Sequence, residues 1–433
     1  MYLNSTTELL ISGGDKRLEL NAHGVNKYGC SPTPDDAILS FSSSTASTIS
    51  IKNFSVADTL RNRLEHALQT TSAEMLYSQE ITRQKNAWRE LIGLATETQL
   101  IFSPSGTDLH ALVAHYVAPN TLIIMVDGNE TGSGVEMALK QGQNVEVVSI
   151  ALRFDDGLPR AISIIDADVL AQVARAMEQQ RDVLLIVADQ SKTGMIAPSP
   201  DCAMQLKNQY KLRLNVLVDA CQFRLSATTL NAYLQHDFMI ALTGSKFLAA
   251  PSFSAILLLP APLRMAEKSE AINWGLLLRM EIALGEYRAF HVLTDAQISE
   301  IIRDFADAVQ NYLSASPHFE PLETPVLNRG NLVETPMWDN LRTIFPFILL
   351  RGNKPLSRAE TLACYQELPL QNPRCQMGQP VMCGNEQSAL RLCLSAPLIV
   401  QAAKNKACRR DMIQNALQVL ATLETLVQFQ YND

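Results

Sequence analysis

The sequence lacks the features that mark a nucleic-acid-binding or membrane-spanning protein. Its formal net charge of −8 gives no support to a basic surface for nucleic acid or for an anionic membrane. No apolar segment approaches the length needed to span a bilayer, and the N-terminus does not combine a basic head with a long apolar stretch. We therefore expect a cytoplasmic protein with neither nucleic acid nor membrane among its partners.

Cysteine motifs are also missing. The eight cysteines are scattered, with no CxxC pair and no Cys/His spacing suited to zinc. We expect reduced thiols, several of them buried, and no metal. Hydrophobic residues make up 47% of the chain and charged residues 18%, a balance that argues against disorder. At 433 residues, the chain is long enough for two domains, one large and one smaller.

From residue 99 onward, short apolar runs alternate with helix-length segments, which predicts a parallel sheet covered on both faces by helices. Only a few residues separate the last two runs, too few for a helical crossover, so we expect the last strand to be antiparallel or to return through a hairpin. The fold class is therefore α/β, a three-layer sandwich with a mostly parallel, mainly seven-stranded sheet. The expected strands are 99–103, 121–127, 145–152, 183–189, 214–219, 238–244 and 254–260.

The domain organisation follows from the flanking segments. Residues 58–69 and 81–94 have amphipathic helical patterns, and the earlier stretch SFSSSTASTIS is expected to be a loop. The stretch SASPHFEPLETP, rich in proline and serine, marks the start of a smaller α+β domain. The expected divisions are an N-terminal segment (1–57) that packs partly with the small domain, a large domain (58–290), and a linking helix with the small C-terminal domain (291–433).

Polar residues gather where the expected strands end, which is where open parallel sheets bind ligands. SGTD (105–108) offers a glycine, hydroxyls and free amides at a helix start, and these suit a phosphate, although a simple helix cap is the alternative. Asp219 could cap a helix, ligate a metal or pair with a cationic ring nitrogen. Lys246 stands alone between two apolar runs, and a solvated turn lysine is its alternative. Together these groups form the set that a phosphorylated aldehyde cofactor needs.

Five motifs in this order resemble the fold-type I pyridoxal-phosphate enzymes, and within them the class V aminotransferase and cysteine desulfurase group. The resemblance spans roughly residues 60–400, and its motifs are short but jointly specific. It implies pyridoxal 5′-phosphate (PLP) as the cofactor, bound in the large domain of a fold-type I PLP transferase-like architecture. The motifs are SGTD (105–108), SKTGMIAP (191–198), VDACQ (218–222), TGSK (243–246) and ALRLCLSA (389–396).

The resemblance implies three principal roles. Lys246 would form the internal aldimine with the cofactor and then move the Cα proton of an amino acid. Asp219 would pair with the pyridinium nitrogen and keep it protonated. Arg391 would bind the substrate α-carboxylate through its bidentate fork, with a surface charge as the alternative.

Further cofactor contacts are implied in the same way. Gln222 matches the glutamine that hydrogen-bonds the phenolic oxygen in desulfurase-like members, and Ser191 stands where relatives often carry asparagine near that oxygen. Relatives usually place an aromatic or histidine ring over the cofactor from the loop that here spans 127–134. This loop has no ring, so Thr131, Glu130 or the backbone would cover the cofactor face. The residues that would hold the phosphate are Ser105, Gly106, Thr107 and Thr243.

Other departures narrow the chemistry. Desulfurases carry a sulfur-accepting cysteine in a mobile loop, whereas Cys364 lies in a helical run and Cys375 and Cys383 flank MGQPV, so persulfide chemistry is disfavoured. Group II decarboxylases have histidine before the lysine, where Ser245 stands here. An aminotransferase is our first expectation. A β- or γ-eliminating lyase, resembling C–S lyases but without the desulfurase cysteine loop, is the alternative, and a non-catalytic PLP-binding protein is a further one.

Relatives are mostly homodimers that share their active sites, so the resemblance also implies a homodimer. Arg279, Arg288 and the Ser/Thr positions in 42–48 are candidates for lining the site, with helix-surface charges and a loop as the alternative. His110 and His115 follow the phosphate cup, and we interpret both as helix-face residues rather than catalysts. The sequence does not indicate which amino acid is the substrate.

Overall fold

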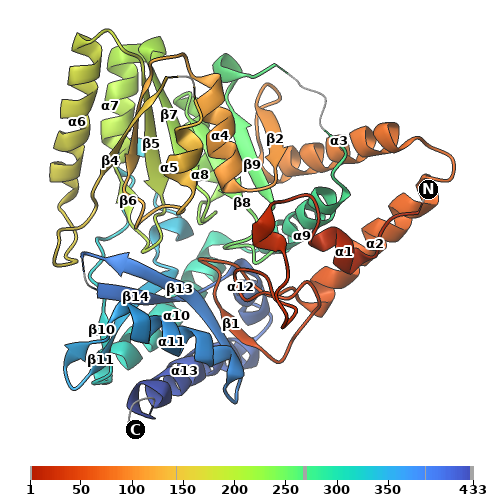
Figure 1. Cartoon of the computed structure of the whole chain (residues 1–433), viewed down its shortest axis with the longest axis vertical. Helices are drawn as coiled ribbons and strands as arrows, with labels where there is room; N and C mark the ends of the chain where they lie inside the picture. Colours follow the sequence, from red (N-terminus) through yellow and green to blue (C-terminus); the bar gives the residue numbers. More distant parts are fainter. Residues whose placement is uncertain (1, 143, 267–270, 386, 430–433) are drawn as a thin grey trace.

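The computed structural model describes residues 2–142, 144–266, 271–385 and 387–429. Two sheets form the upper and lower halves of the molecule in Figure 1. Among the described helices, none is both long enough and apolar enough to cross a bilayer.

The larger sheet has the seven principal strands expected from the sequence, in the order β2-β9-β8-β7-β5-β3-β4. Neighbours are parallel except β9, which is antiparallel to both β2 and β8, so the expected reversal of the last strand is confirmed. A short strand, β6 (Ile196–Ala197), pairs with β5. The principal strands are β2 (Gln99–Ser103), β3 (Leu122–Val126), β4 (Glu146–Ile150), β5 (Val183–Asp189), β7 (Leu214–Ala220), β8 (Met239–Thr243) and β9 (Ala255–Leu259).

Helices cover both faces of this sheet. Successive side chains of a strand point to opposite faces, so each strand contributes to an apolar core on either side. Leu184 and Ile186 belong to an apolar cluster with α4 and α5, whereas Leu185 and Val187 belong to the main core with α6, α7 and α8. This confirms the three-layer α/β architecture. The helices are α4 (Gly106–Tyr116), α5 (Val135–Leu139), α6 (Ile162–Glu178), α7 (Pro200–Tyr210) and α8 (Ala227–Gln235).

The smaller sheet has the order β1-β13-β14-β11-β10, with β12 paired to β11. Strand β1 comes from the N-terminal segment and runs parallel to β13, whereas the other pairs are antiparallel. The chain therefore brings residues from both of its ends into one sheet. The elements of this half are β1 (Leu39–Phe41), β10 (Phe319–Pro321), β11 (Ile344–Arg351), β12 (Lys354–Pro355), β13 (Cys375–Cys383), β14 (Gln387–Cys393), α10 (Asp295–Ala315), α11 (Arg358–Glu367), α12 (Ala396–Ala402) and α13 (Lys406–Phe429).

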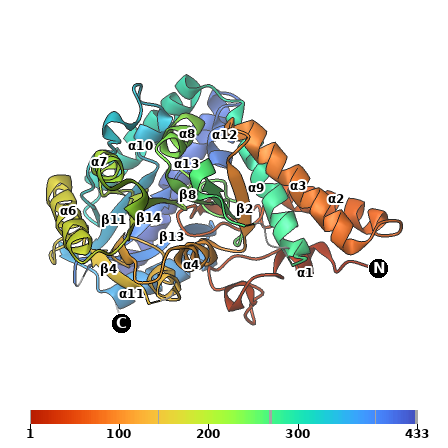
Figure 2. The same cartoon turned by 90° about the horizontal axis from the view of Figure 1, so that it is seen from above.

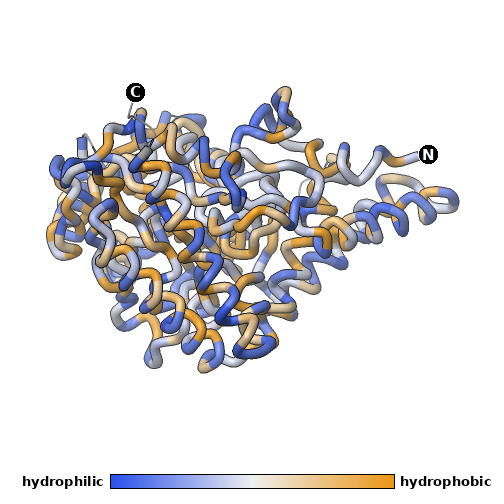
Figure 3. The backbone as a smooth tube through the Cα atoms, turned by 90° about the horizontal axis from the view of Figure 1, so that it is seen from below, coloured by the Kyte–Doolittle hydropathy of each residue, from blue (hydrophilic) through white to orange (hydrophobic). Residues whose placement is uncertain are grey.

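Two long helices, α2 (Ile51–Ala67) and α3 (Ala73–Ile92), extend from the body as an arm, seen at the right of Figure 1 and again in Figure 2. Much of the arm is hydrophilic (Figure 3). Both helices begin earlier than expected, because Ser50 and Ser72 cap their first turns. Helix α2 therefore spans the domain boundary that the sequence placed at residue 57. Helix α1 (Thr6–Leu10) packs against α9 (Trp274–His291) and also contacts α2 of the arm.

Candidate functional site

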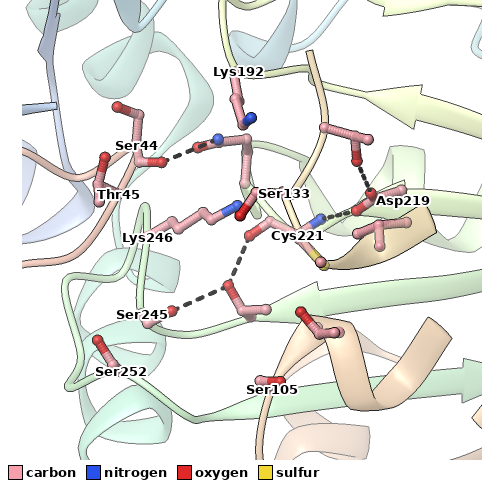
Figure 4. Close-up of a pocket in the computed structure, with 18 of the residues that line it drawn as sticks. Ser44, Thr45, Ser105, Ser133, Lys192, Asp219, Cys221, Ser245, Lys246 and Ser252 are labelled. Atoms are coloured by element: carbon pink, nitrogen blue, oxygen red, sulfur yellow. Dashed lines mark hydrogen bonds between the residues drawn. The ribbon is translucent and has the colours of Figure 1, made fainter. Parts of the chain in front are cut away.

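A pocket of about 190 Å³ lies at the carboxyl ends of the parallel strands, where the N-terminal segment and the smaller sheet meet the larger one. Figure 4 shows serine, lysine and aspartate side chains entering it from several separate segments. The residues expected to carry catalysis, to bind the cofactor or to bind the substrate carboxylate all line this one pocket: Ser105, Gly106, Thr107, Thr131, Ser191, Asp219, Gln222, Thr243, Lys246 and Arg391.

The N-terminus of α4 forms a tight cup on one side of the pocket. Ser105 caps the helix by accepting from the Asp108 amide at 3.3 Å, while the Asp108 carboxylate accepts from the Ser105 amide at 2.9 Å. The expected cup and the alternative helix cap are therefore the same structure. A Cβ at Gly106 would lie 2.7 Å from Cys221 Sγ, so the close approach of the two segments requires glycine. The remaining free amides of the first turn favour an anion.

Arg17, which the sequence analysis did not identify, lies at this cup. It belongs to a short 3₁₀ helix (Lys16–Leu18) in the N-terminal segment. Its guanidinium donates to Ser105 Oγ at 3.0 Å and to Thr107 Oγ1 at 3.3 Å, and it forms an ion pair with Asp15 at 2.7 Å. A cation therefore lies over the hydroxyls of the expected phosphate site. No local motif could have indicated it, because 88 residues separate Arg17 from Ser105.

Asp219 is the second-last residue of β7 and is almost completely buried. Its carboxylate accepts from Thr131 Oγ1 at 3.1 Å and from the Cys221 amide at 3.2 Å, and His110 Nε2 lies 3.5 Å away. Burial raises the pKa of Asp219, but the positive charges of His110 and Lys246 outweigh burial and hold the pKa well below its usual range. Asp219 is therefore an ionised carboxylate at the base of the pocket.

His110 is fully buried on α4, and its Nδ1 lies 2.7 Å from the Gly106 carbonyl oxygen. Burial lowers its pKa, but the Asp219 carboxylate reverses this and leaves the pKa raised. The sequence predicts only a helix-face role for His110 and does not indicate its contact with Asp219. Its position one turn after Gly106 was the available signal, because that spacing places it on the face beneath the cup. His115 is exposed on the same helix, outside the pocket lining.

Lys246 lies in the turn that follows β8 and extends into the pocket (Figure 4). A Cβ at Gly244 would lie 2.5 Å from the Ala283 side chain, so the turn packs directly against α9. The next two side chains, Phe247 and Leu248, are buried in the core. These contacts fix the turn from both sides, which aims the lysine at the pocket instead of solvent.

Arg391 is buried in β14, which confirms the inward-facing strand arginine. Its Nη2 donates to the Gln379 carbonyl at 2.6 Å and to Thr45 Oγ1 at 3.1 Å, and its Nη1 donates to the Lys192 carbonyl at 3.3 Å. Burial lowers its pKa. Among the described residues, no carboxylate forms an ion pair with Arg391, so its charge is available to an acidic ligand.

Glu130 and Thr131, the two residues considered for covering the cofactor, have different surroundings. The buried Glu130 carboxylate accepts from Arg153 Nε at 3.0 Å, from Ser191 Oγ at 2.7 Å and from Thr193 Oγ1 at 2.8 Å. The Glu130 carboxylate is therefore fixed in place and its charge is neutralised by Arg153. The Thr131 hydroxyl instead donates to the Asp219 carboxylate. Glu130 and Thr131 both line the pocket. Two aromatic residues from outside this loop, Tyr28 and Phe253, also line it.

Several buried polar atoms of the lining have no hydrogen-bond partner. They are Ser44 Oγ, Gln222 Oε1 and both amide atoms of Gln190. Buried polar atoms normally find partners, so this concentration indicates a place for a polar ligand.

Of the further candidates for lining the pocket, two of the Ser/Thr positions line it and the two arginines do not. Ser44 and Thr45, from the Ser/Thr run, line the pocket of their own chain. Arg279 does not line it, because it is fully buried and donates to the carbonyls of Phe253, Leu10 and Ser12. Arg288 is exposed on α9, outside the lining.

No protein-family model and no curated protein matches the sequence. Solved structures do match. The cysteine desulfurase CsdA of Escherichia coli has a TM-score of 0.57 and 14% identity, covering 89% of this chain and 95% of that one. A NifS-like protein of Rickettsia africae has a TM-score of 0.57 and 10% identity, covering 89% and 99%.

The serine palmitoyltransferase of Sphingomonas wittichii has a TM-score of 0.52 and 11% identity, covering 80% of this chain and 77% of that one. A related serine palmitoyltransferase structure contains a PLP internal aldimine. At these identities the likeness concerns the fold. The chain has the fold of the fold-type I pyridoxal-phosphate enzymes, as the sequence resemblance implied.

Proposed function

We propose that this protein is a PLP-dependent enzyme that acts on an α-amino acid, and specifically an aminotransferase. The observation that carries the proposal is the meeting, in one pocket, of Lys246, the ionised Asp219 and an anion cup covered by Arg17. Solved neighbours of the same fold include PLP enzymes, which supports the same assignment.

The residues fit the four functional groups of PLP. The cup of α4 with Arg17 suits the phosphate, and Asp219 suits a protonated ring nitrogen. Gln222 has an unpartnered amide oxygen in the pocket and is placed for the ring substituents. Lys246 is the amine for the aldehyde. The unpartnered polar atoms of the lining are an independent sign that a polar group of this kind belongs here.

The bound cofactor supplies an electron-accepting ring that stabilises negative charge on the Cα of an attached amino acid. Asp219, held by Thr131 and the Cys221 amide, keeps its charge fixed where the ring nitrogen would lie. Arg391 binds the α-carboxylate and orients the amino acid. Lys246 would hold the cofactor through its aldehyde, and its Nζ, when free, would accept the Cα proton of the amino acid and could return it to another carbon.

The alternatives share this apparatus. Elimination of a β- or γ-substituent would use the same Lys246 and Asp219, and a protein that binds PLP without turnover would use only the binding contacts. Cys221 lines the pocket, but burial and the neighbouring Asp219 raise the pKa of its thiol, which disfavours persulfide chemistry. We also propose a cytoplasmic homodimer with shared active sites, and sedimentation of the purified protein tests the dimer.

The test begins with cofactor binding. PLP added to the purified protein should produce a visible absorbance band that is absent from Lys246→Ala and retained by Lys140→Ala, a control on the exposed surface of the chain. The loaded protein is then mixed with single amino acids. Conversion to the pyridoxamine form supports an aminotransferase, whereas release of a keto acid with ammonia supports a lyase. A wild-type protein that gives no band with PLP would refute the assignment.

A further inference from the structure

Lys192 is a pocket residue that the proposed mechanism does not use. It lies in the turn after β5, next to Ser191, and lines the same pocket as Lys246. Figure 4 shows the two lysines entering from different segments. Lys192 Nζ donates to the carbonyl oxygen of Gly128 at 3.0 Å, a neutral acceptor. In the part of the chain that the structure describes, no ion pair of Lys192 is found.

The acidic groups near the pocket are already engaged. Glu130 pairs with Arg153, which lies outside the lining, and Asp219 lies beside His110. Arg17 has its own partner, Asp15. Among the described residues, none of these acids forms an ion pair with Lys192, Lys246 or Arg391.

Three cations, Lys192, Lys246 and Arg391, are left without an acidic partner of their own among the described residues. They are close neighbours, since the Arg391 guanidinium contacts the Lys192 carbonyl at 3.3 Å. Burial, together with the charges of Arg391 and Lys246, lowers the pKa of Lys192 to about 8, against the opposing pull of Glu130 and Asp127. The pocket therefore carries excess positive charge, which favours anions.

A monoanionic amino acid would leave Lys192 without an anion in contact with it. In the proposed function, the phosphate occupies the cup, the aldehyde engages Lys246 and the α-carboxylate engages Arg391. Lys192 then remains as a cation at the pocket wall with only a carbonyl oxygen as its partner. A second anionic group on the substrate would provide the missing counter-charge, and a lysine ammonium with rotatable donors suits such a group.

We infer that the substrate of this site is an acidic amino acid, with an anionic group such as a carboxylate at the end of its side chain, and that Lys192 binds that group. This inference rests on the proposed function for the α-amino acid part of the substrate. It deepens that proposal by assigning the substrate class and a specificity-determining residue.

The test compares ligands that differ only in the second charge. Aspartate and asparagine, and glutamate and glutamine, are titrated into the PLP-loaded protein, and the cofactor absorbance reports binding. We expect each acid to bind at least tenfold more tightly than its amide. Lys192→Gln should abolish that difference while leaving the amides unchanged, Lys192→Arg should restore it, and the surface control Lys140→Gln should behave as wild type. Equal binding of acids and amides, or an equal loss for both in Lys192→Gln, overturns the inference.

A second measurement separates this inference from the proposed function. Succinate and butyrate are titrated calorimetrically into cofactor-free protein with the cup saturated by inorganic phosphate. Succinate should bind at least tenfold more tightly, and only in proteins that retain a cation at position 192. If PLP does not bind but this preference is found, the proposed function fails and the dianion site stands. If PLP binds and the preference is absent from both measurements, the inference fails alone.

Discussion

Replacing Arg17 with glutamine should weaken the binding of PLP through its phosphate alone. The two guanidinium contacts, to Ser105 Oγ at 3.0 Å and Thr107 Oγ1 at 3.3 Å, place the cation where it can donate to a phosphate in the cup. A hydrogen bond to a charged group contributes about 1.5–3 kcal/mol. The ion pair with the half-exposed Asp15 competes for the guanidinium, but such pairs contribute only about 0–1 kcal/mol. The net loss of about 0.5–3 kcal/mol corresponds to roughly 2- to 150-fold weaker binding.

The assay is a titration of cofactor-free protein with PLP and, separately, with pyridoxal, which lacks the phosphate. Arg17→Gln should lose affinity for PLP and keep its affinity for pyridoxal. Arg213→Gln is the matched control, because Arg213 forms a similar pair with Asp182 at 3.3 Å outside the pocket. Equal losses for PLP and pyridoxal, or no loss for either, would refute the reasoning, because the effect would then not depend on the phosphate.

Three further predictions concern other parts of the molecule. Arg329→Met should lower the free energy of unfolding in urea by about 3–5 kcal/mol, because it leaves the fully buried carboxylate of Asp189 without its partner at 2.8 Å; a loss below about 1 kcal/mol contradicts this. Asp219→Asn should still bind PLP but turn over at least about a hundredfold more slowly, since it removes a charge that stabilises the reacting state; near-normal turnover in a single-turnover assay argues against its role. Succinate affinity should fall as pH rises through about 8, where Lys192 loses its proton, and Lys192→Arg should remain unaffected there; a fall that is identical in the two proteins contradicts the assignment of Lys192.

The strands were predicted closely because their sequence signal is local. Strands β2 and β5 begin and end where the apolar runs do, since a strand buried on both faces is apolar throughout. The starts of α2 and α3 were placed too late. Their first turns are set by the caps of Ser50 and Ser72 and only later turns show the apolar pattern. A serine that ends a loop and a serine that starts a helix have the same sequence appearance.

The pocket residues divide in the same way. Residues at the end of a strand or in the turn after it, such as Asp219 and Lys246, could be identified from the sequence, because the topology fixes where strand ends meet. Arg17 reaches the pocket only through packing of the N-terminal segment against distant parts of the chain. Thr45 reaches it in the same way, although the Ser/Thr run that contains it could be named as a candidate. His110 required knowledge of which helix face turns toward Asp219. Their positions depend on tertiary contacts that no spacing in the sequence expresses.

The pairing of β1 with β13 has a consequence for biosynthesis. Ser40 and Gln376 are hydrogen-bonded across 336 residues, so β1 cannot complete its sheet until most of the chain has left the ribosome. The segment that carries Arg17, Ser44 and Thr45 must wait for the same event, although it is synthesised long before β13. Contacts that close such long loops form late in folding. A nascent chain should therefore acquire its ligand pocket only after β13 has been translated, and a truncated chain that lacks β13 should have a folded larger sheet without a finished site.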